Sequence, residues 1–93
     1  MKIVDNLIIG IGKEGLNKTY QEDFPETTEC VHCKGEARIA LTLVEENGYR
    51  EKYICSLHKN DPKGEGLWLH DCCAVAVYFC KDCLEPTALA NQA

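Results

Sequence analysis

The stretch CVHCKGEARIALTLVEENG, residues 30–48, contains a cysteine pair, an alternating apolar run and an Asn-Gly turn. Within the run, Ile39, Leu41 and Leu43 recur at every second position, which is the period of a half-buried β-strand. Asn-Gly between two β-prone runs is a strong hairpin signal, so residues 49–54 are expected to return as the partner strand. The stretch therefore predicts a β-hairpin with a cysteine pair at its open end.

Four pairs of possible metal ligands share one spacing. Each pair has two intervening residues, and the pairs are Cys30/Cys33, Cys55/His58, His70/Cys73 and Cys80/Cys83. A gap of two residues lets one tight turn aim two side chains at the same ion, and zinc ligands recur at this spacing. Eight ligands make two tetrahedral sites, so we expect about two zinc ions per chain. Cys72 is left over and is expected to be a small buried side chain.

The sequence leaves other roles open for these residues. The two Cys-x2-Cys pairs could be inert buried thiols or a redox dithiol. His70 and Cys73 could instead be a surface histidine and a small core residue, because free cysteine packs as a small hydrophobe.

Residues 30–58 resemble a zinc ribbon, in which turns at the ends of a β-hairpin grip one ion. Cys30, Cys33, Cys55 and His58 occupy its ligand positions, with 21 residues between the two pairs. The resemblance is generic, and it implies a small, mainly-β, metal-stabilised domain. As a broad expectation it also implies a role in transcription, translation or protein docking.

The four pairs can divide between two sites in three ways. In a sequential division the first pair joins the second and the third joins the fourth; a straight strand between Cys73 and Cys80 would hold them about 23 Å apart, so this division needs a bend. In a nested division the first pair meets the last, and the middle pairs meet across an 11-residue loop. An interleaved division resembles RING-type and PHD-type fingers, the former implying a ubiquitin ligase, but the long loop departs from both patterns.

The chain is expected to have three parts. Residues 1–29 form an N-terminal strand, over 3–11, and an acidic arm, over 17–29. Residues 30–86 form the zinc-binding β domain, and residues 87–93 form a flexible tail beyond Pro86.

Two further segments have a predicted structure. Gly10, Gly12 and Gly15 match the spacing G-x-G-x-x-G, but no βαβ unit follows, so we expect turn glycines rather than a dinucleotide site. Residues 67–69 and 74–79 are apolar and are expected to form a second strand pair.

The charge of the chain is acidic, with 10 Lys and Arg against 15 Asp and Glu in 93 residues, a formal net charge of −5. Nucleic-acid affinity rests on cations that displace counterions from phosphates. The cations near the predicted hairpin, Arg38, Arg50 and Lys52, fall short of the basic stripe of a dedicated nucleic-acid binder. The charge therefore argues against nucleic acid as the partner.

The expected compartment is the cytoplasm. The N-terminus lacks the residue order of a signal peptide, and no stretch approaches the roughly 20 apolar residues of a membrane span. Disulfides are rare in the cytoplasm, where Cys-x2-Cys pairs more often hold metal or do redox work.

These features predict a non-catalytic zinc-binding interaction module that docks to a protein partner, and not an enzyme. Every candidate ligand is committed to a four-ligand site, whereas a catalytic zinc keeps one position for water. The alternatives are a nucleic-acid-binding zinc ribbon and a rubredoxin-like electron-transfer protein, with iron on Cys30, Cys33, Cys80 and Cys83. Thiol-disulfide exchange through the first pair would favour a following helix, whereas a strand pattern follows here.

Overall fold

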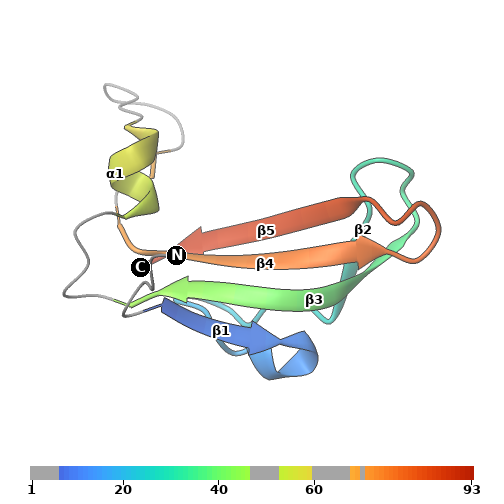
Figure 1. Ribbon diagram of the computed structural model, residues 1–93, viewed down its shortest axis with the longest axis horizontal. Helices are drawn as coiled ribbons and strands as arrows, with labels where there is room; N and C mark the ends of the chain where they lie inside the picture. Colours follow the sequence, from blue (N-terminus) through green and yellow to red (C-terminus); the bar gives the residue numbers. More distant parts are fainter. Residues whose placement is uncertain (1–6, 47–52, 60–67, 70) are drawn as a thin grey trace, which may run out of the picture.

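The computed structural model describes residues 7–46, 53–59, 68–69 and 71–93, and its main feature is an antiparallel β-sheet (Figure 1). The strands are β1 (Leu7–Ile11), β2 (Thr27–Glu29), β3 (Glu36–Glu45), β4 (Cys73–Cys80) and β5 (Pro86–Gln92). The helices are the short 3-10 helix η1 (Gly12–Gly15) and the α-helix α1 (Ile54–His58). No helix in the described part of the chain is long and apolar enough to cross a membrane. The expectation of a small, mainly-β chain is confirmed.

β3 is the central strand of the sheet. β1 and β2 lie end to end along one of its edges, and β4 pairs with the other edge, so that the strand order is β1-β3-β4-β5. A β-bulge shifts the register between Ile39 and Leu41. Because of the extra residue, Ile39 packs against the core while Leu41 and Leu43 lie on the opposite face, so the single-face alternation expected for the three residues is wrong.

The hairpin expected between β3 and residues 49–54 is also wrong. Both edges of β3 carry other strands, and Ile54 begins α1 instead of ending a strand. Residues 49–52 and the Asn-Gly turn lie outside the described residues. The strand beside β3 in the described sheet is β4, so the hairpin expected within residues 30–58 is not part of that sheet.

The C-terminal residues 87–93, expected as a flexible tail, belong to the sheet. Pro86 begins β5 rather than closing the last element, and β5 pairs with β4 along its length. Proline is compatible with this position because it is the first residue of an edge strand. Trp68 and Leu69 lie outside any strand, so the partner of β4 is not the expected segment 67–69.

The core lies on one face of the sheet. Every second residue of β4 is buried, as one covered face requires: Ala74, Ala76, Tyr78 and Cys80. The cover is the segment between η1 and β2, which passes behind the sheet in Figure 1 and buries Phe24. Tyr78 fastens this cover because its hydroxyl donates to the Pro25 carbonyl oxygen at 2.6 Å. Residues 17–26 of the expected arm therefore form the second layer of the core, and residues 27–29 form β2 in the sheet.

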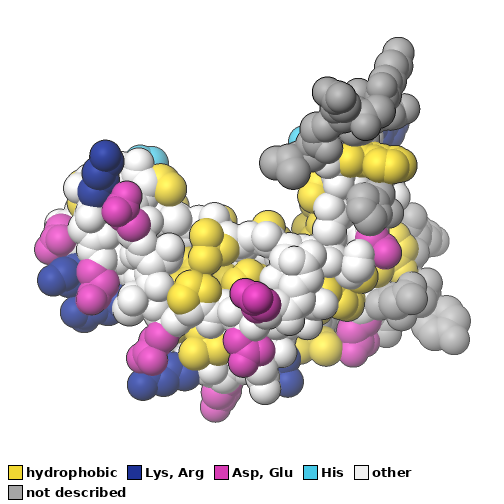
Figure 2. Space-filling view, turned by 180° about the vertical axis from the view of Figure 1, so that it is seen from behind, with side chains coloured by type: hydrophobic (Ala, Val, Ile, Leu, Met, Phe, Trp, Pro, Cys, Tyr) yellow, Lys and Arg dark blue, Asp and Glu magenta, His cyan; other side chains and the backbone are white. Residues whose placement is uncertain are grey.

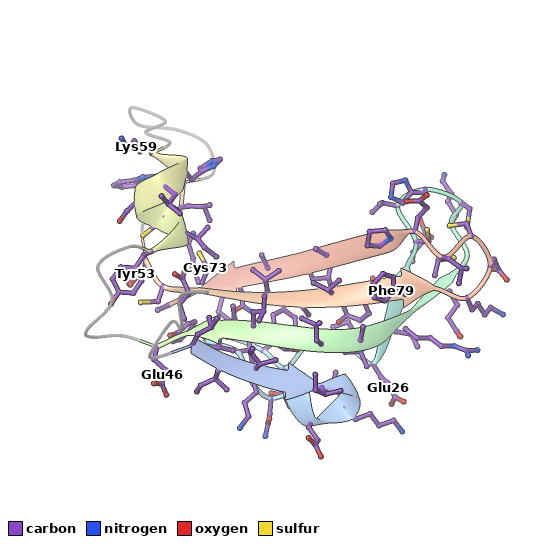
Figure 3. All side chains as sticks on the ribbon, viewed as in Figure 1. Glu26, Glu46, Tyr53, Lys59, Cys73 and Phe79 are labelled. Carbon is purple, nitrogen blue, oxygen red and sulfur yellow. The ribbon has the colours of Figure 1, made fainter. Side chains whose placement is uncertain are left out.

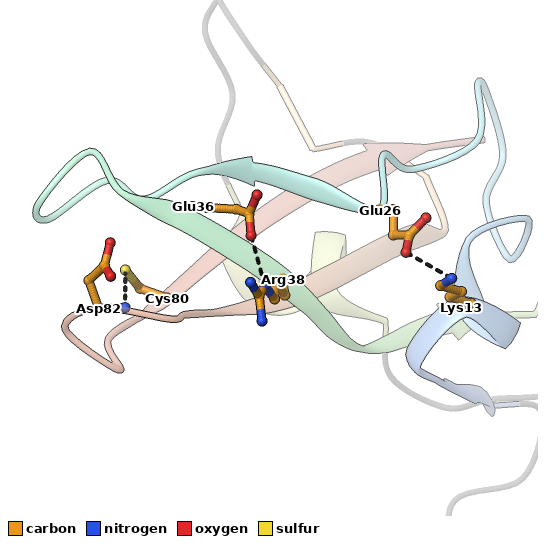
Figure 4. A network of polar contacts seen from close by, with 6 residues as sticks. All are labelled: Lys13, Glu26, Glu36, Arg38, Cys80 and Asp82. Atoms are coloured by element: carbon orange, nitrogen blue, oxygen red, sulfur yellow. Dashed lines mark hydrogen bonds and ion pairs between the residues drawn. The ribbon is translucent and has the colours of Figure 1, made fainter.

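The glycines of the G-x-G-x-x-G match form a tight turn after β1. Gly12 has a φ of +57°, and a Cβ on Gly10 would lie 2.5 Å from the Cα of Gly15. The turn also carries Lys13, whose ammonium pairs with Glu26 of the covering segment at 3.0 Å (Figure 4). The prediction of turn glycines is confirmed, since Gly12–Gly15 form a 3-10 helix and Gly10 packs directly against Gly15.

We expect Gly10→Ala to lower the free energy of unfolding by about 3 kcal/mol, because its new methyl group meets backbone that cannot rotate away. Gly12→Ala is the matched variant, since a Cβ there meets nothing within 4 Å and only the positive φ is unfavourable. It should cost about 1 kcal/mol. Urea unfolding followed by circular dichroism measures both, and equal losses would contradict the close approach of the two turn residues.

Candidate metal centre

Four cysteine sulfurs meet at one end of the sheet, from two turns far apart in the sequence. The ligand atoms of Cys30, Cys33, Cys80 and Cys83 all lie within 4.8 Å of one another. The Cys30 and Cys83 sulfurs are 3.7 Å apart, and those of Cys33 and Cys80 are 3.5 Å apart. In a tetrahedral zinc site with Zn–S bonds of about 2.3 Å, neighbouring sulfurs are about 3.8 Å apart. The cluster therefore has the dimensions of a four-thiolate metal site.

The first turn has a backbone that curls around its inner cysteine. The N–H of Lys34 donates to the Cys30 carbonyl oxygen at 3.0 Å, and the N–H of Cys30 donates to the Gly35 carbonyl oxygen at 2.8 Å. Lys34 adopts a left-handed φ of 65°. Two further N–H groups, of His32 and Cys33, point at the Cys30 sulfur at 3.3 and 3.5 Å.

The second turn repeats these bonds 50 residues later. The N–H of Leu84, a residue with a φ of 63°, donates to the Cys80 carbonyl oxygen at 3.1 Å. The N–H of Cys80 donates to the Glu85 carbonyl oxygen at 3.1 Å. The N–H groups of Asp82 and Cys83 point at the Cys80 sulfur at 3.4 and 3.5 Å (Figure 4). Both turns thus present one sulfur inward, surrounded by backbone donors.

The sheet brings the two turns together. Cys30 follows β2 and Cys80 ends β4, and both strands flank β3. The N–H of Lys81 donates to the Glu36 carbonyl oxygen at 3.0 Å, which ties the second turn to the start of β3. Both inner sulfurs belong to fully buried residues, whereas Cys33 and Cys83 are exposed. The metal would therefore join the core to the surface at this end.

The backbone donors favour the charged form of the inner sulfurs. The N–H groups of Cys33 and His32 hold the pKa of the Cys30 thiol at about 6. The equivalent N–H groups of the second turn lower the pKa of Cys80. Both inner cysteines are thus prepared to bind as thiolates.

The outer cysteines behave in the opposite way. The Gly35 N–H favours the Cys33 thiolate, but the neighbouring Cys80 sulfur and burial outweigh it and raise the pKa. The Glu85 N–H favours the Cys83 thiolate, yet burial and the other sulfurs raise its pKa to about 12. Four negative charges at these distances repel one another, so all four thiols can ionise together only around a cation.

The other described ligand candidates, Cys55, His58 and Cys73, lie at the opposite end of β4 from the four-sulfur cluster. Cys55 and His58 are in α1, and Cys73 begins β4, whose far end carries Cys80; Figure 3 labels Cys73 and Phe79 at these two ends. The set implied by the zinc-ribbon resemblance is therefore not assembled, because Cys55 and His58 are remote from the first cysteine pair. His70 lies outside the described residues. Of the three divisions, only the nested one places the first pair with the last.

Among the described residues, no second group of three or more possible metal ligands comes together. Glu45 nevertheless ties α1 to β4: its carboxylate accepts the N–H groups of Ile54 and Cys73, both at 3.1 Å. Burial raises the pKa of the Cys73 thiol to about 11, with smaller contributions from the Glu45 carboxylate and from Cys55. The Glu45 carboxylate thus holds the chain at Ile54 close to the chain at Cys73.

Sequence reasoning did not single out Glu45. The residue is 1% exposed, and the Tyr20 hydroxyl donates to its carbonyl oxygen. One signal was available, since Glu45 continues the alternation of Leu41 and Leu43 at a position where an apolar residue is the norm. A carboxylate there indicates buried donors that need an acceptor.

Comparison of the chain with protein families, with curated proteins and with solved structures finds no significant match. The centre is therefore interpreted from its own geometry.

We expect Cys33→Ser to remove one metal ion per chain, because a serine hydroxyl is a poor replacement for a thiolate. Cys72→Ser should keep every ion and cost about 0.5 to 3 kcal/mol of packing, since the Cys72 side chain is buried outside the four-sulfur cluster. Native mass spectrometry of reduced protein counts the ions, and calorimetry gives the melting temperatures. Loss of an ion from the Cys72 variant alone would contradict the assignment.

Glu45→Ala should destabilise the chain by about 2 to 4 kcal/mol, because it leaves the N–H groups of Ile54 and Cys73 without this acceptor. Glu46→Ala is the control, since Glu46 is exposed and should change the free energy of unfolding by less than about 0.5 kcal/mol. Denaturant unfolding compares the two variants. If they unfold alike, the carboxylate does not connect α1 to the sheet.

Proposed function

We propose that this chain is a non-catalytic, zinc-binding interaction module that docks to a protein partner. The observation that carries the proposal is the four-sulfur cluster, in which Cys30, Cys33, Cys80 and Cys83 would fill all four positions of a tetrahedral ion. A catalytic zinc needs a position for water or substrate, and a closed thiolate site is typical of structural zinc.

The placement of the cluster supports a structural role for the metal. One of its turns follows β2 and the other follows β4, so an ion would join residues about 50 positions apart in the sequence. The core holds few large side chains and several alanines, and Tyr78 is the largest fully buried residue described. Small domains with modest cores commonly use a metal as an additional constraint.

The charge of the chain supports a protein as the partner. The net charge is −5, and in the described residues the exposed Arg38 side chain already pairs with Glu36 at 2.8 Å (Figure 4). Lys13 is likewise paired with Glu26. An acidic chain in which two exposed cations are already paired with glutamates offers little to a phosphate backbone, so nucleic acid stays the less favoured alternative.

A second zinc ion, held by Cys55, His58, His70 and Cys73, belongs to the same proposal on the strength of the ligand spacing. A count of two ions in the native mass spectrum supports this second site. A count of one restricts the metal to the four-cysteine cluster.

Tetrathiolate sites also accept iron, which makes a rubredoxin-like electron carrier the second candidate function. The two candidates differ in colour. Oxidised iron protein is red with visible absorption bands, whereas zinc protein is colourless. Dominant iron in aerobically purified protein would overturn the zinc module.

Chelation should unfold the chain. Zinc binding at such sites is on the order of 10 to 16 kcal/mol, while small domains have only about 5 to 15 kcal/mol of stability in total. We expect the dispersed amide NMR spectrum to collapse when a strong chelator removes zinc under reducing conditions, and to return when zinc is added back. An unchanged spectrum after metal analysis verifies removal would contradict the structural role of the ion.

A further inference from the structure

The β5 strand has an open edge whose hydrogen-bonding groups can be assigned one by one. At the two ends of the ladder, Cys80 bonds to Glu85 and Ala93 bonds to Cys72. Hydrogen-bonded pairs alternate along an antiparallel ladder, so the residues of β5 that bond to β4 are the odd-numbered ones. The N–H and C=O groups of Ala88 and Ala90 therefore point away from β4, and in the described part of the structure they have no partner.

This edge is closed at both ends by side chains of other segments. His32 Nε2 donates to the Pro86 carbonyl oxygen at 3.2 Å, and Gln21 Nε2 donates to the Gln92 carbonyl oxygen at 2.9 Å. Proline has no N–H to offer at the first position. The open length between these two contacts spans about six residue steps, or roughly 20 Å. It matches an extended peptide of about five residues.

The sheet face beside this edge is apolar, and no segment among the described residues covers it. Two cross-strand rows of aliphatic side chains run over it towards β5: Ile9, Leu43, Val75 and Ala90 in one, and Ile11, Leu41, Val77 and Ala88 in the other. Ile9 and Ile11 are 57% and 65% exposed. Each row ends at β5 in an alanine, so large side chains on an added strand would lie over these methyl groups and extend both rows. A contiguous apolar face of this kind marks an interaction surface.

The shape of the molecule argues against a second copy on this edge. Figure 2 shows the outline hollowed between the cysteine turns at one end and α1 at the other, and in Figure 1 β5 is the strand that borders this hollow. A second copy would bring its own β5 from between the same two projections. A single extended strand is narrow enough to enter. Edge strands recessed in this way are protected from self-pairing.

Charge gives the chemistry of the peptide. The chain carries a net charge of −5, and acidic side chains lie beyond both ends of the edge, with Glu85 before Pro86 and Asp71 beside the end of β5. The two rows themselves carry no charge. An apolar centre with basic flanks is therefore complementary to this surface.

We propose that an extended peptide of a protein partner, with alternating large apolar residues and basic flanks, adds to the sheet as a further strand on the open edge of β5. Its backbone would exchange hydrogen bonds with Ala88 and Ala90, and its apolar side chains would continue the two rows. This mode of recognition takes its affinity from backbone bonds and its specificity from alternate side chains. The inference rests on the proposed interaction module and names the partner class for it.

The probe is a capped peptide, Lys-Thr-Ile-Thr-Ile-Thr-Lys, titrated into zinc-loaded, isotopically labelled protein. We expect the amide resonances of Ala88 and Ala90 to shift and to gain protection from hydrogen exchange, because their N–H groups acquire acceptors. The Leu89 amide, which already bonds to β4, should change little. The same peptide with N-methylated alternate amides should bind at least about tenfold more weakly, a loss of about 1.4 kcal/mol.

Ala90→Pro removes one outward N–H and leaves the bonds between β4 and β5 in place, so it should weaken peptide binding at least about tenfold. Ala90→Ser keeps the N–H at similar size and should bind the peptide as the natural chain does. Unchanged binding to the proline variant, or shifts confined to other residues, would overturn the proposal. If Ala90→Pro fails to fold, the binding of the methylated peptide and the amide shifts of Ala88 and Ala90 still test the proposal.

Light scattering over a dilution series tests for a second copy on the edge, and a dimer that Ala90→Pro dissociates would overturn the peptide as occupant. Metal analysis of the same samples separates this result from the proposed function. Zinc-loaded protein that ignores the peptide overturns the edge assignment alone, whereas protein without zinc overturns the zinc module whatever the peptide does.

Discussion

The mutual approach of four cysteine sulfurs is the constraint on which the rest of this structure depends. Sulfurs 3.5 to 3.7 Å apart cannot all carry negative charge without a cation between them. The backbone of each turn favours this arrangement, because two of its N–H groups point at the inner sulfur and stabilise the thiolate form. A cation bound between the sulfurs would offset the cost of gathering these charges, and it would thereby couple metal binding to folding.

The four-sulfur cluster also gives the sheet two ends with different properties. At the cysteine end, both turns are held by backbone hydrogen bonds and by the inner sulfurs, which are fully buried. At the other end, the buried carboxylate of Glu45 joins the start of α1 to the start of β4, because it accepts one N–H group from each. Between the ends, the described segments cover only one face of the sheet. The uncovered face and the β5 edge are what remains available for a partner.

The candidate site was partly predictable because its signals are local. A gap of two residues between ligands is a property of a single turn, so Cys30/Cys33 and Cys80/Cys83 could be recognised without knowing the fold. The period-2 run around Leu41 likewise predicted a strand. Which pair meets which is a matter of strand order, and neither spacing nor periodicity carries that information. The nested division was one of three that the spacing allowed.

The sequence by itself determined that the chain is small, mainly β and equipped with turns that can bind metal, because each of these properties depends on residues within a few positions of one another. Tertiary structure alone decided that β3 pairs with β1 and β4 rather than with the segment after Asn-Gly, since an interior strand gains hydrogen bonds along both edges and the local turn signal cannot compete. It also decided that residues 87–93 are a strand. Their sequence has little β-propensity, and they are ordered by the ladder that β4 offers them.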